Sequence, residues 1–219
     1  MKGRPLLLHQ VRMPPMQSEI DTDTKNSPFL VIGLGNPGRQ YRNNRHNIGF
    51  RVLDRLAERL GITYSRVMFR ALTADTRYQE RRLFLAKPQT YMNDSGLSVG
   101  SLVRFYKIPL ENILVIHDDV DLPFDTFRLR PKGGSAGQKG MLSIIEHLGT
   151  QNFPRLRFGV GRPPGRMVAA AYVLQDFNRE EAEILPLLID RAADAALTFV
   201  TTGLEATMNK FNPAAEDTD

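Results

Sequence analysis

Apolar residues along this chain form two kinds of pattern, unbroken runs and helically spaced sets. The unbroken runs are residues 29–35 (FLVIGLG), 83–87 (LFLAK) and 113–117 (ILVIH). Short runs of this kind are typical of strands buried on both faces. Residues 126–130 and 155–160 instead alternate apolar with basic side chains, which predicts strands that turn one face toward solvent.

Helical spacing marks the segments between these strands. Apolar residues recur at helical intervals over 48–60, so we predict a helix there that Gly61 ends. Further helices are predicted over 97–106, with Ser95 as a cap, and over 138–148 and 179–202. Because strands and helices alternate with short connections, we predict an α/β fold. It is a single domain with a twisted, mostly parallel mixed central sheet and helices on both faces.

The two ends of the chain differ from this folded unit. Residues 1–27 are polar and contain Pro14 and Pro15, so they are predicted to form a mobile extension, and residues 213–219 a flexible acidic tail. The domain then spans residues 28–212. No apolar run reaches the roughly 20 residues that a membrane span needs, and the patch at 6–8 is far shorter than a secretory signal requires. We expect a cytoplasmic protein without a membrane partner.

Composition narrows the class of protein further. The 219 residues include no cysteine, which excludes a disulfide framework and any thiolate metal site. Hydrophobic residues make up 42% and charged residues 24%, which excludes a wholly disordered chain. The net charge of +5 is a modest hint of a polyanionic partner.

Residues 33–38 (GLGNPG) follow the first strand with the glycine spacing of a dinucleotide-binding turn. A nucleotide-dependent oxidoreductase is therefore one hypothesis. It requires a helix directly after the glycines and an acidic residue at the end of the second strand. Here Pro37 and a polar run delay the helix, and Asp54 lies inside that helix. The other interpretation is a turn through which the chain leaves the sheet.

His46 is the candidate catalytic residue, because it follows the end of the first strand, where ligands bind in open α/β sheets. Residues 117–121 (HDDVD) end another buried strand. An aspartate that accepts from one imidazole nitrogen leaves the other free to take a proton from water. A metal site in this acidic segment, a capped acidic turn and a surface histidine are the alternatives.

Two further segments carry side chains suited to binding. Residues 88–96 (PQTYMNDSG) connect a strand to a helix, and are either a ligand-contacting loop or a turn with a helix cap. Basic side chains surround the glycine-rich residues 133–140 (GGSAGQKG), which suits phosphate oxygens. Arginines 128 and 130 share one strand face, and arginines 155 and 157 share another. This arrangement favours a polyanion over scattered solubility charges.

These segments, in this order, closely resemble bacterial-type peptidyl-tRNA hydrolases. The resemblance spans the folded unit, from FLVIGLGNPGRQY and RHNIGF, through KPQTYMNDSG and ILVIHDDVDLPF, to KGGSAGQKG, FPRLRFGVGRP and YVLQDF. It implies a single α/β domain and hydrolysis of the ester that joins a peptide to the 3′-terminal ribose of tRNA, which recycles tRNA from aborted translation. It implies no metal and no organic cofactor, and a monomer is expected.

The resemblance also implies roles for individual residues. It implies His46 as the catalytic histidine and Asp118 as its carboxylate partner. The substrate-binding residues are implied to be Asn36, Tyr41, Met92 and Asn93, with Tyr41 at the terminal nucleotide. Lys139 is a further candidate for substrate binding, although it departs from the family pattern. Acceptor-stem phosphates are implied to contact Arg130 and Arg157.

One position departs from the family pattern. Where the family usually has Gly-His-Asn-Gly, this chain has Gly137, Gln138, Lys139 and Gly140. The usual asparagine helps to hold the substrate and the attacking water, whereas the ammonium of Lys139 donates hydrogen bonds but does not accept them. A non-catalytic RNA-binding relative, of the splicing-factor kind, is therefore the alternative to an active hydrolase.

Overall fold

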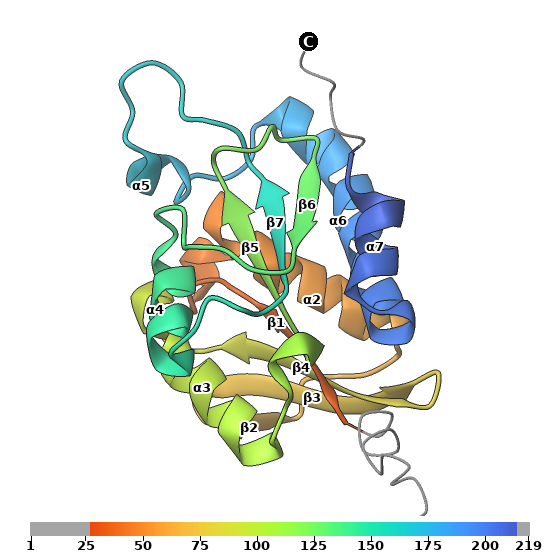
Figure 1. Cartoon of the computed structure of the whole chain (residues 1–219). Helices are drawn as coiled ribbons and strands as arrows, with labels where there is room; N and C mark the ends of the chain where they lie inside the picture. Colours follow the sequence, from red (N-terminus) through yellow and green to blue (C-terminus); the bar gives the residue numbers. More distant parts are fainter. Residues whose placement is uncertain (1–26, 214–219) are drawn as a thin grey trace, which may run out of the picture.

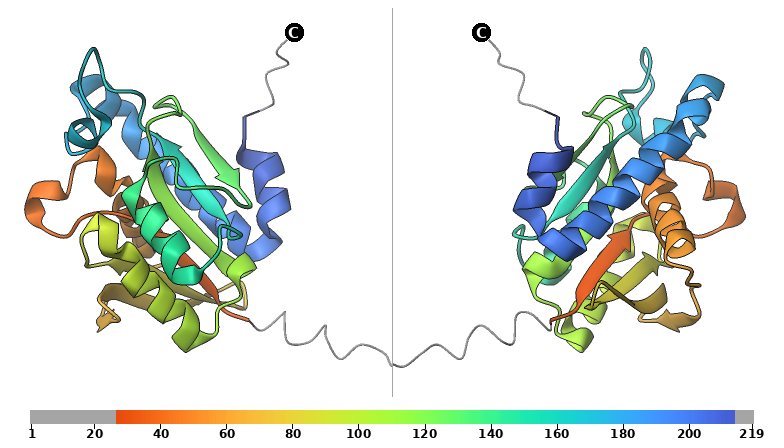
Figure 2. Two further views of the ribbon diagram at one scale, coloured as in Figure 1. Left: turned by 60° about the vertical axis from the view of Figure 1, so that its left-hand side comes forward. Right: turned by 90° about the vertical axis from the view of Figure 1, so that its right-hand side faces the viewer.

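The structure is a computed structural model that describes residues 27–213. Within this range a twisted seven-stranded sheet lies between two layers of helices (Figures 1 and 2). Except for residues 27 and 213 themselves, the predicted extension 1–27 and the predicted tail 213–219 lie outside the described residues.

The sheet has the order β2-β3-β4-β1-β5-β7-β6. Strands β4, β1, β5 and β7 are mutually parallel, and β3 and β6 run antiparallel to their neighbours. Because β2 is antiparallel to β3, five of the seven strands share one direction, which confirms the mostly parallel mixed sheet. The strands are β1 (Phe29–Gly33), β2 (Arg66–Met68), β3 (Ala71–Tyr78), β4 (Arg81–Pro88), β5 (Ile113–Asp119), β6 (Phe127–Arg130) and β7 (Arg155–Gly159).

The central strands are apolar throughout because each of their faces meets a separate core. In β1, Val31 packs into the core on one side of the sheet and Leu30 and Ile32 into the core on the other. The first core is covered by α2 (Ile48–Arg59), α6 (Arg179–Thr202) and α7 (Leu204–Phe211), and the second by α3 (Ser95–Tyr106) and α4 (Lys139–Leu148). The predicted burial of this strand on both faces is confirmed.

Several elements differ from the sequence prediction. Strands β2 and β3, helix α7 and the short helix α5 (Ala169–Tyr172) were not predicted. Ser95 is not a cap but the first residue of α3, and its hydroxyl donates to the backbone oxygen of Met92 at 2.8 Å. The α4 helix begins at Lys139, one residue later than predicted. The described residues also form four short 3-10 turns: η1 (Arg39–Tyr41), η2 (Arg45–Asn47), η3 (Met92–Asp94) and η4 (Leu110–Asn112).

The first turn of α2 lies directly on the backbone of the sheet. A β-carbon added at Gly49 would lie 2.4 Å from the backbone oxygen of Ile116 and 2.4 Å from the backbone nitrogen of Leu34. A β-carbon added at Gly33 would meet the backbone oxygen of Gly49 at 2.2 Å. Two glycines therefore allow the contact between α2, β1 and β5. This contact places the residues just before α2, 45–47, at the carboxyl ends of the strands.

Gly49→Ala is expected to lower the free energy of unfolding by about 3 kcal/mol, because backbone atoms on both sides leave no room for a methyl group. Gly134→Ala is the control, since no atom lies within 4 Å of its added β-carbon, and it should stay within about 0.5 kcal/mol of wild type. Urea unfolding of the three proteins measures both values. Equal stability of Gly49→Ala and wild type would contradict this packing.

Candidate active site

The carboxyl ends of β1, β4 and β5 and the loops that follow them surround a cavity of about 380 Å³. Such an edge is where ligands bind in open α/β sheets. The lining includes six residues that the sequence singled out, of which five are Asn36, His46, Met92, Asn93 and Asp118. It also includes Lys139, together with apolar side chains from α5 and the residues after it. The structure thus brings most of the predicted site together.

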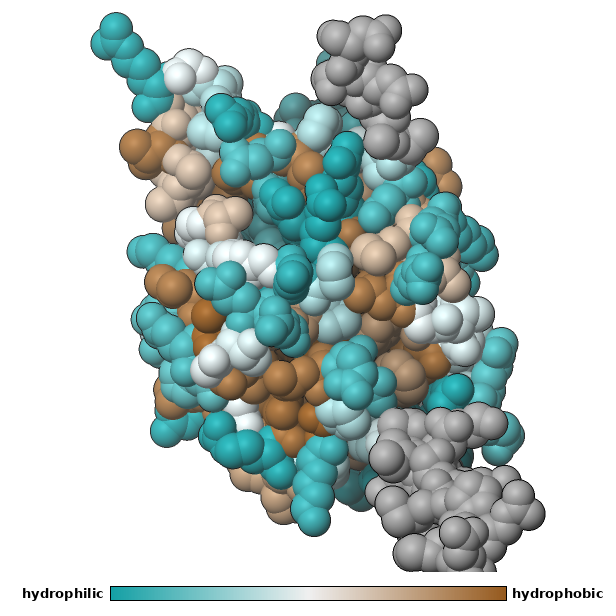
Figure 3. All heavy atoms as spheres, in the orientation of Figure 1, coloured by the Kyte–Doolittle hydropathy of each residue, from teal (hydrophilic) through white to brown (hydrophobic). Residues whose placement is uncertain are grey.

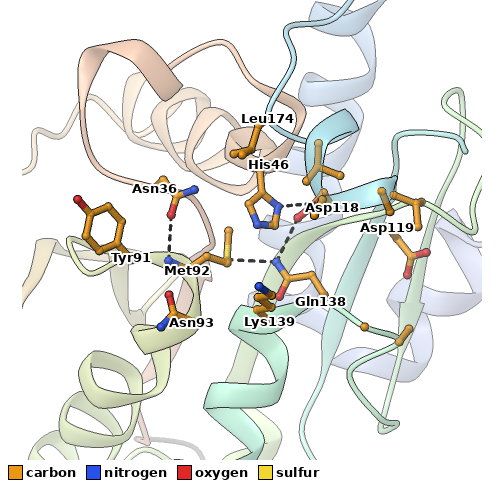
Figure 4. Close-up of a pocket in the computed structure, with 16 residues that line it drawn as sticks. Asn36, His46, Tyr91, Met92, Asn93, Asp118, Asp119, Gln138, Lys139 and Leu174 are labelled. Atoms are coloured by element: carbon orange, nitrogen blue, oxygen red, sulfur yellow. Dashed lines mark hydrogen bonds and ion pairs between the residues drawn. The ribbon is translucent and has the colours of Figure 1, made fainter. Parts of the chain in front are cut away.

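His46 and Asp118 form the central pair of this cavity. The Nδ1 atom of His46 lies 2.8 Å from Oδ2 of Asp118, as Figure 4 shows. The Asp118 side chain is 3% exposed, whereas that of His46 is 13% exposed. Because Nδ1 faces the carboxylate, Nε2 is the nitrogen available to a group in the cavity. The pairing predicted from the sequence is present in the structure.

Electrostatics keep the buried Asp118 ionised. Burial by itself would raise the pKa of this carboxyl, but the charge and hydrogen bond of His46 outweigh it, with smaller contributions from His117 and Gln138. The pKa of Asp118 therefore lies below its ordinary value. Burial lowers the pKa of His117 in the same strand, so this imidazole is neutral at neutral pH. An anionic Asp118 accepts a hydrogen bond from Nδ1 of His46.

The turn that carries His46 is attached to the chain before α6. The backbone nitrogen of His46 donates to the oxygen of Val173 at 2.8 Å. Arg45 is buried, donates to the backbone oxygen of Asp176 at 2.6 Å and pairs with Glu181 at 2.5 Å. Its guanidinium also lies 4.3 Å from the centre of the Tyr172 ring. These contacts determine where the imidazole sits relative to the sheet.

Asn36 is oriented by two neighbouring segments. Its Oδ1 accepts from the backbone nitrogen of Met92 at 2.9 Å, so its NH2 group remains as a donor on the cavity side. Asn47 brackets the Asn36 backbone, since it accepts from the nitrogen and donates to the oxygen, each at 2.9 Å. Asn93 also lines the cavity and contacts Asp94 at 3.2 Å. The sequence analysis gave Asn47 no role of its own.

Gln138 and Lys139 begin α4 on the opposite side of the cavity. Gln138 is buried, and its Nε2 donates to Oδ1 of Asp118 at 3.1 Å. Lys139 is exposed and reaches the same cavity (Figure 4). The sequence predicted a substrate contact for Lys139, but it gave no role to Gln138. The signal that marks Gln138 is its place at the start of a predicted helix, where a polar side chain caps the first turn.

Tyr41 lies apart from these residues. It ends the 3-10 turn η1, is half-buried, and is not among the side chains that line the cavity. A contact between Tyr41 and the terminal nucleotide stays a prediction.

Arg130 and Arg157 line a second hollow, of about 350 Å³, beside the active-site cavity. In the register of β6 and β7, Arg128 lies opposite Arg157 and Arg130 opposite Arg155, so all four arginines project from one face of the sheet. Figure 3 shows hydrophilic side chains gathered over these strands. Like charges placed directly opposite are destabilising. Asp119 offsets part of this charge, since it pairs with Arg157 at 2.6 Å.

The alternating pattern predicted that Arg155 faces solvent. For this residue the prediction is wrong. Arg155 is 2% exposed and donates to backbone oxygens of Gly133 and Gly134 in the glycine-rich loop. Burial, and after it the charge of Arg157, lower the pKa of Arg155 to about 10. The loop covers this arginine, so Arg155 shapes the wall of the hollow.

The described residues show neither the metal site nor the dinucleotide-binding turn that the sequence left open. The aspartates of residues 117–121 diverge to separate partners, and no group of three metal-ligating side chains forms between residues 27 and 213. After the glycines at 33–38 comes η1, and α2 starts only at Ile48, so the helix that a dinucleotide turn needs is displaced. None of the described helices is long and apolar enough to cross a membrane.

Known proteins with similar sequences and folds share one family. The family model described as peptidyl-tRNA hydrolase matches residues 30–219. The peptidyl-tRNA hydrolase of Chloroflexus aggregans is 50% identical over 186 residues, which cover 84% of this chain and 99% of that protein. The mitochondrial peptidyl-tRNA hydrolase of Oryza sativa subsp. japonica is 47% identical over 188 residues, 85% of this chain and 75% of that protein.

Solved structures agree with the sequence comparison. The crystal structure of peptidyl-tRNA hydrolase from Acinetobacter baumannii matches with a TM-score of 0.79 and 34% identity, over 84% of this chain and 93% of that one. The resemblance seen in the sequence motifs is thereby confirmed across the folded unit. This chain belongs to the peptidyl-tRNA hydrolase family.

Proposed function

We propose that this protein hydrolyses the ester bond between the peptide and the tRNA of peptidyl-tRNA, and so recycles tRNA from aborted translation. The observation that carries the proposal is the His46–Asp118 pair, 2.8 Å apart, at a cavity whose wall also holds the amide of Asn36. An aminoacyl-type ester is already activated, so a base, a water molecule and hydrogen-bond donors to the carbonyl oxygen are sufficient for its hydrolysis.

His46 acts as the general base in this proposal. Its Nε2 takes a proton from a water molecule whose oxygen forms the new bond to the ester carbon. Asp118 stabilises the imidazolium that results, as it faces the other ring nitrogen. The tetrahedral intermediate then breaks its bond to the ribose 3′-oxygen, which takes the proton from His46. The products are tRNA with a free 3′-hydroxyl and the peptide acid, which releases its proton to solvent to become a carboxylate, and no covalent enzyme intermediate forms.

Asn36 and Asn93 supply amide donors to the substrate. The Asn36 amide is held by Met92, so its NH2 group is in place before the substrate arrives. A donor aimed at the oxyanion contributes about 3–4 kcal/mol to transition-state stabilisation. Met92 is buried beneath these amides and contributes packing against the bound ester.

The acceptor stem of tRNA binds across the hollow lined by Arg130 and Arg157. Arg128, Arg130 and Arg157 crowd together on one face of β6 and β7 above the buried Arg155, and this supports the assignment, because their repulsion is relieved when phosphates bind. The hollow lies beside the cavity, as Asp119 and Ala136 line both. A stem bound there leads its 3′ end toward His46.

A non-catalytic RNA-binding role gains no support from the relatives described above, which are named as hydrolases. We also propose that the protein works as a monomer in the cytoplasm. The rice relative is named as mitochondrial, so membership of the family does not by itself specify a compartment. Size-exclusion chromatography with light scattering checks the oligomeric state, and a dimer would contradict it.

His46→Ala is expected to lower kcat by about 10²–10⁴-fold while tRNA binding is retained, because the loss of a general base acts on the chemical step. Asp118→Asn should cause a smaller loss, since the fold remains but the imidazolium loses its anionic partner. Single-turnover hydrolysis of N-blocked aminoacyl-tRNA measures both rates. Near-normal turnover in His46→Ala would end the general-base assignment.

Arg130→Ala should weaken tRNA binding and reduce the slope of log K against log salt by about 1, as expected for one lost phosphate contact. The double variant with Arg157→Ala should reduce this slope further. Arg77→Ala is the control. Arg77 lies on β3, near the opposite edge of the sheet from β6 and β7, so its loss removes the same charge and should leave the slope unchanged. An unchanged slope in the double variant would place the RNA elsewhere.

Lys139 is proposed to act by charge, at the ester oxyanion or at the 3′-terminal phosphate. Lys139→Met should then reduce kcat/KM, whereas Lys139→Asn should hold or raise it, because an amide both donates and accepts. Single-turnover rates for the three proteins test this. Equal rates would show that position 139 has no part in the reaction, and an inert wild type would refute the proposed hydrolase activity.

A further inference from the structure

We infer that Gln138 is a positioning residue for the His46–Asp118 pair. Its side-chain amide, oriented by the first turn of α4, holds the Asp118 carboxylate in the orientation that His46 requires. The inference rests on the proposed function, because it assigns Gln138 a part in the same hydrolysis.

The two oxygens of Asp118 have separate partners. Oδ1 accepts from Nε2 of Gln138 at 3.1 Å, and Oδ2 faces Nδ1 of His46 at 2.8 Å (Figure 4). The carboxylate is 3% exposed, so bulk solvent does not replace a lost partner. A carboxylate held at both oxygens is prevented from turning about its Cβ–Cγ bond. Gln138 therefore determines which lone pair is presented to His46.

The start of α4 determines which end of the Gln138 amide faces Asp118. Gln138 is the N-cap residue, and its Oε1 accepts from the backbone nitrogen of Met141 at 2.7 Å. If the amide were flipped, its oxygen would face the anionic carboxylate and its NH2 group would face a backbone donor. Both contacts would then be repulsive. Helix capping thus orients Nε2 as a donor to Asp118.

The same amide connects the base to the oxyanion-binding side of the cavity. Nε2 of Gln138 also lies 3.2 Å from the sulfur of Met92, whose backbone nitrogen holds Oδ1 of Asn36. A β-carbon added at Gly140 would lie 2.5 Å from that sulfur and 3.1 Å from Oε1 of Gln138. The first turn of α4 is therefore packed tightly against the Met92 side chain and against Gln138 itself, which restricts the movement of Gln138.

Two substitutions separate this role from helix capping. Gln138→Ser keeps a good N-cap oxygen but is too short to reach Asp118. Gln138→Glu keeps the cap and nearly the same shape, but it replaces the donor by an oxygen beside the carboxylate. The charged or titratable groups around Asp118 are His46 from η2, His117 and Asp119 from its own strand, and Tyr91 and Lys139 elsewhere in the cavity wall. A second carboxylate there favours the imidazolium over the free base.

Steady-state kinetics with N-blocked aminoacyl-tRNA test the inference on the whole chain. Gln138→Ser should lower kcat by about tenfold with KM unchanged within about twofold, because a hydrogen bond to a charged group is lost. Gln138→Glu should lower kcat further at neutral pH. Gln138→His, which restores the residue usual in the family, keeps a ring N–H donor and should stay within about threefold of wild type.

The controls distinguish positioning from folding. Gln138→Ser and Gln138→Glu should melt at a lower temperature than wild type, because each loses a partner of the buried Asp118, but both keep the cap and should remain folded at the assay temperature. Gln151→Ser, at an exposed site outside the cavity, should match wild type in every measurement. Wild-type kcat in both Gln138→Ser and Gln138→Glu would reduce Gln138 to a helix cap and overturn the inference. A rise in KM with kcat unchanged would make it a substrate contact instead. An inert wild type would contradict the proposed function itself.

Discussion

A carboxylate buried at the end of a central strand is the constraint on which this site depends. Asp118 is almost fully enclosed, and an ion in such a place costs several kcal/mol unless opposite charge or hydrogen bonds compensate it. His46 and Gln138 provide those partners from two different segments of the chain. The two contacts that compensate the burial of Asp118 therefore also fix the orientation of the imidazole of His46, the proposed base.

Close backbone contact makes this arrangement geometrically possible. Gly49 lets the first turn of α2 rest on β1 and β5, and this places His46 at the end of the strand that carries Asp118. On the other face of the sheet, Gly140 lets the first turn of α4 pack against the side chains of Met92 and Leu34, and Gln138, two residues before it, reaches the carboxylate. The first turns of α2 and α4 thus fix the positions of His46 and Gln138 relative to Asp118.

Much of this could be predicted from the sequence, because local patterns encode it. The apolar runs of β1 and β5 and the ends of α6 follow from strand and helix periodicity, and the family motifs point to His46 and Asp118. Strands β2 and β3 were missed because the turns that join them to each other and to β4 place Phe69, Arg70, Gln79 and Glu80 at positive φ without a glycine to signal them. The burial of Arg155 and the role inferred for Gln138 depend on loops and helices distant in sequence, which no local pattern reveals.

The tautomer of His46 is the most direct test of the account. Nitrogen-15 NMR of histidine-labelled protein at neutral pH, with the His46→Ala spectrum used for assignment, reports which ring nitrogen carries the proton. The account predicts a neutral imidazole with its proton on Nδ1, bonded to Asp118, and a bare Nε2 facing the cavity. A proton on Nε2 with Nδ1 bare would contradict it, because the nitrogen in the cavity would then be unable to accept a proton from water.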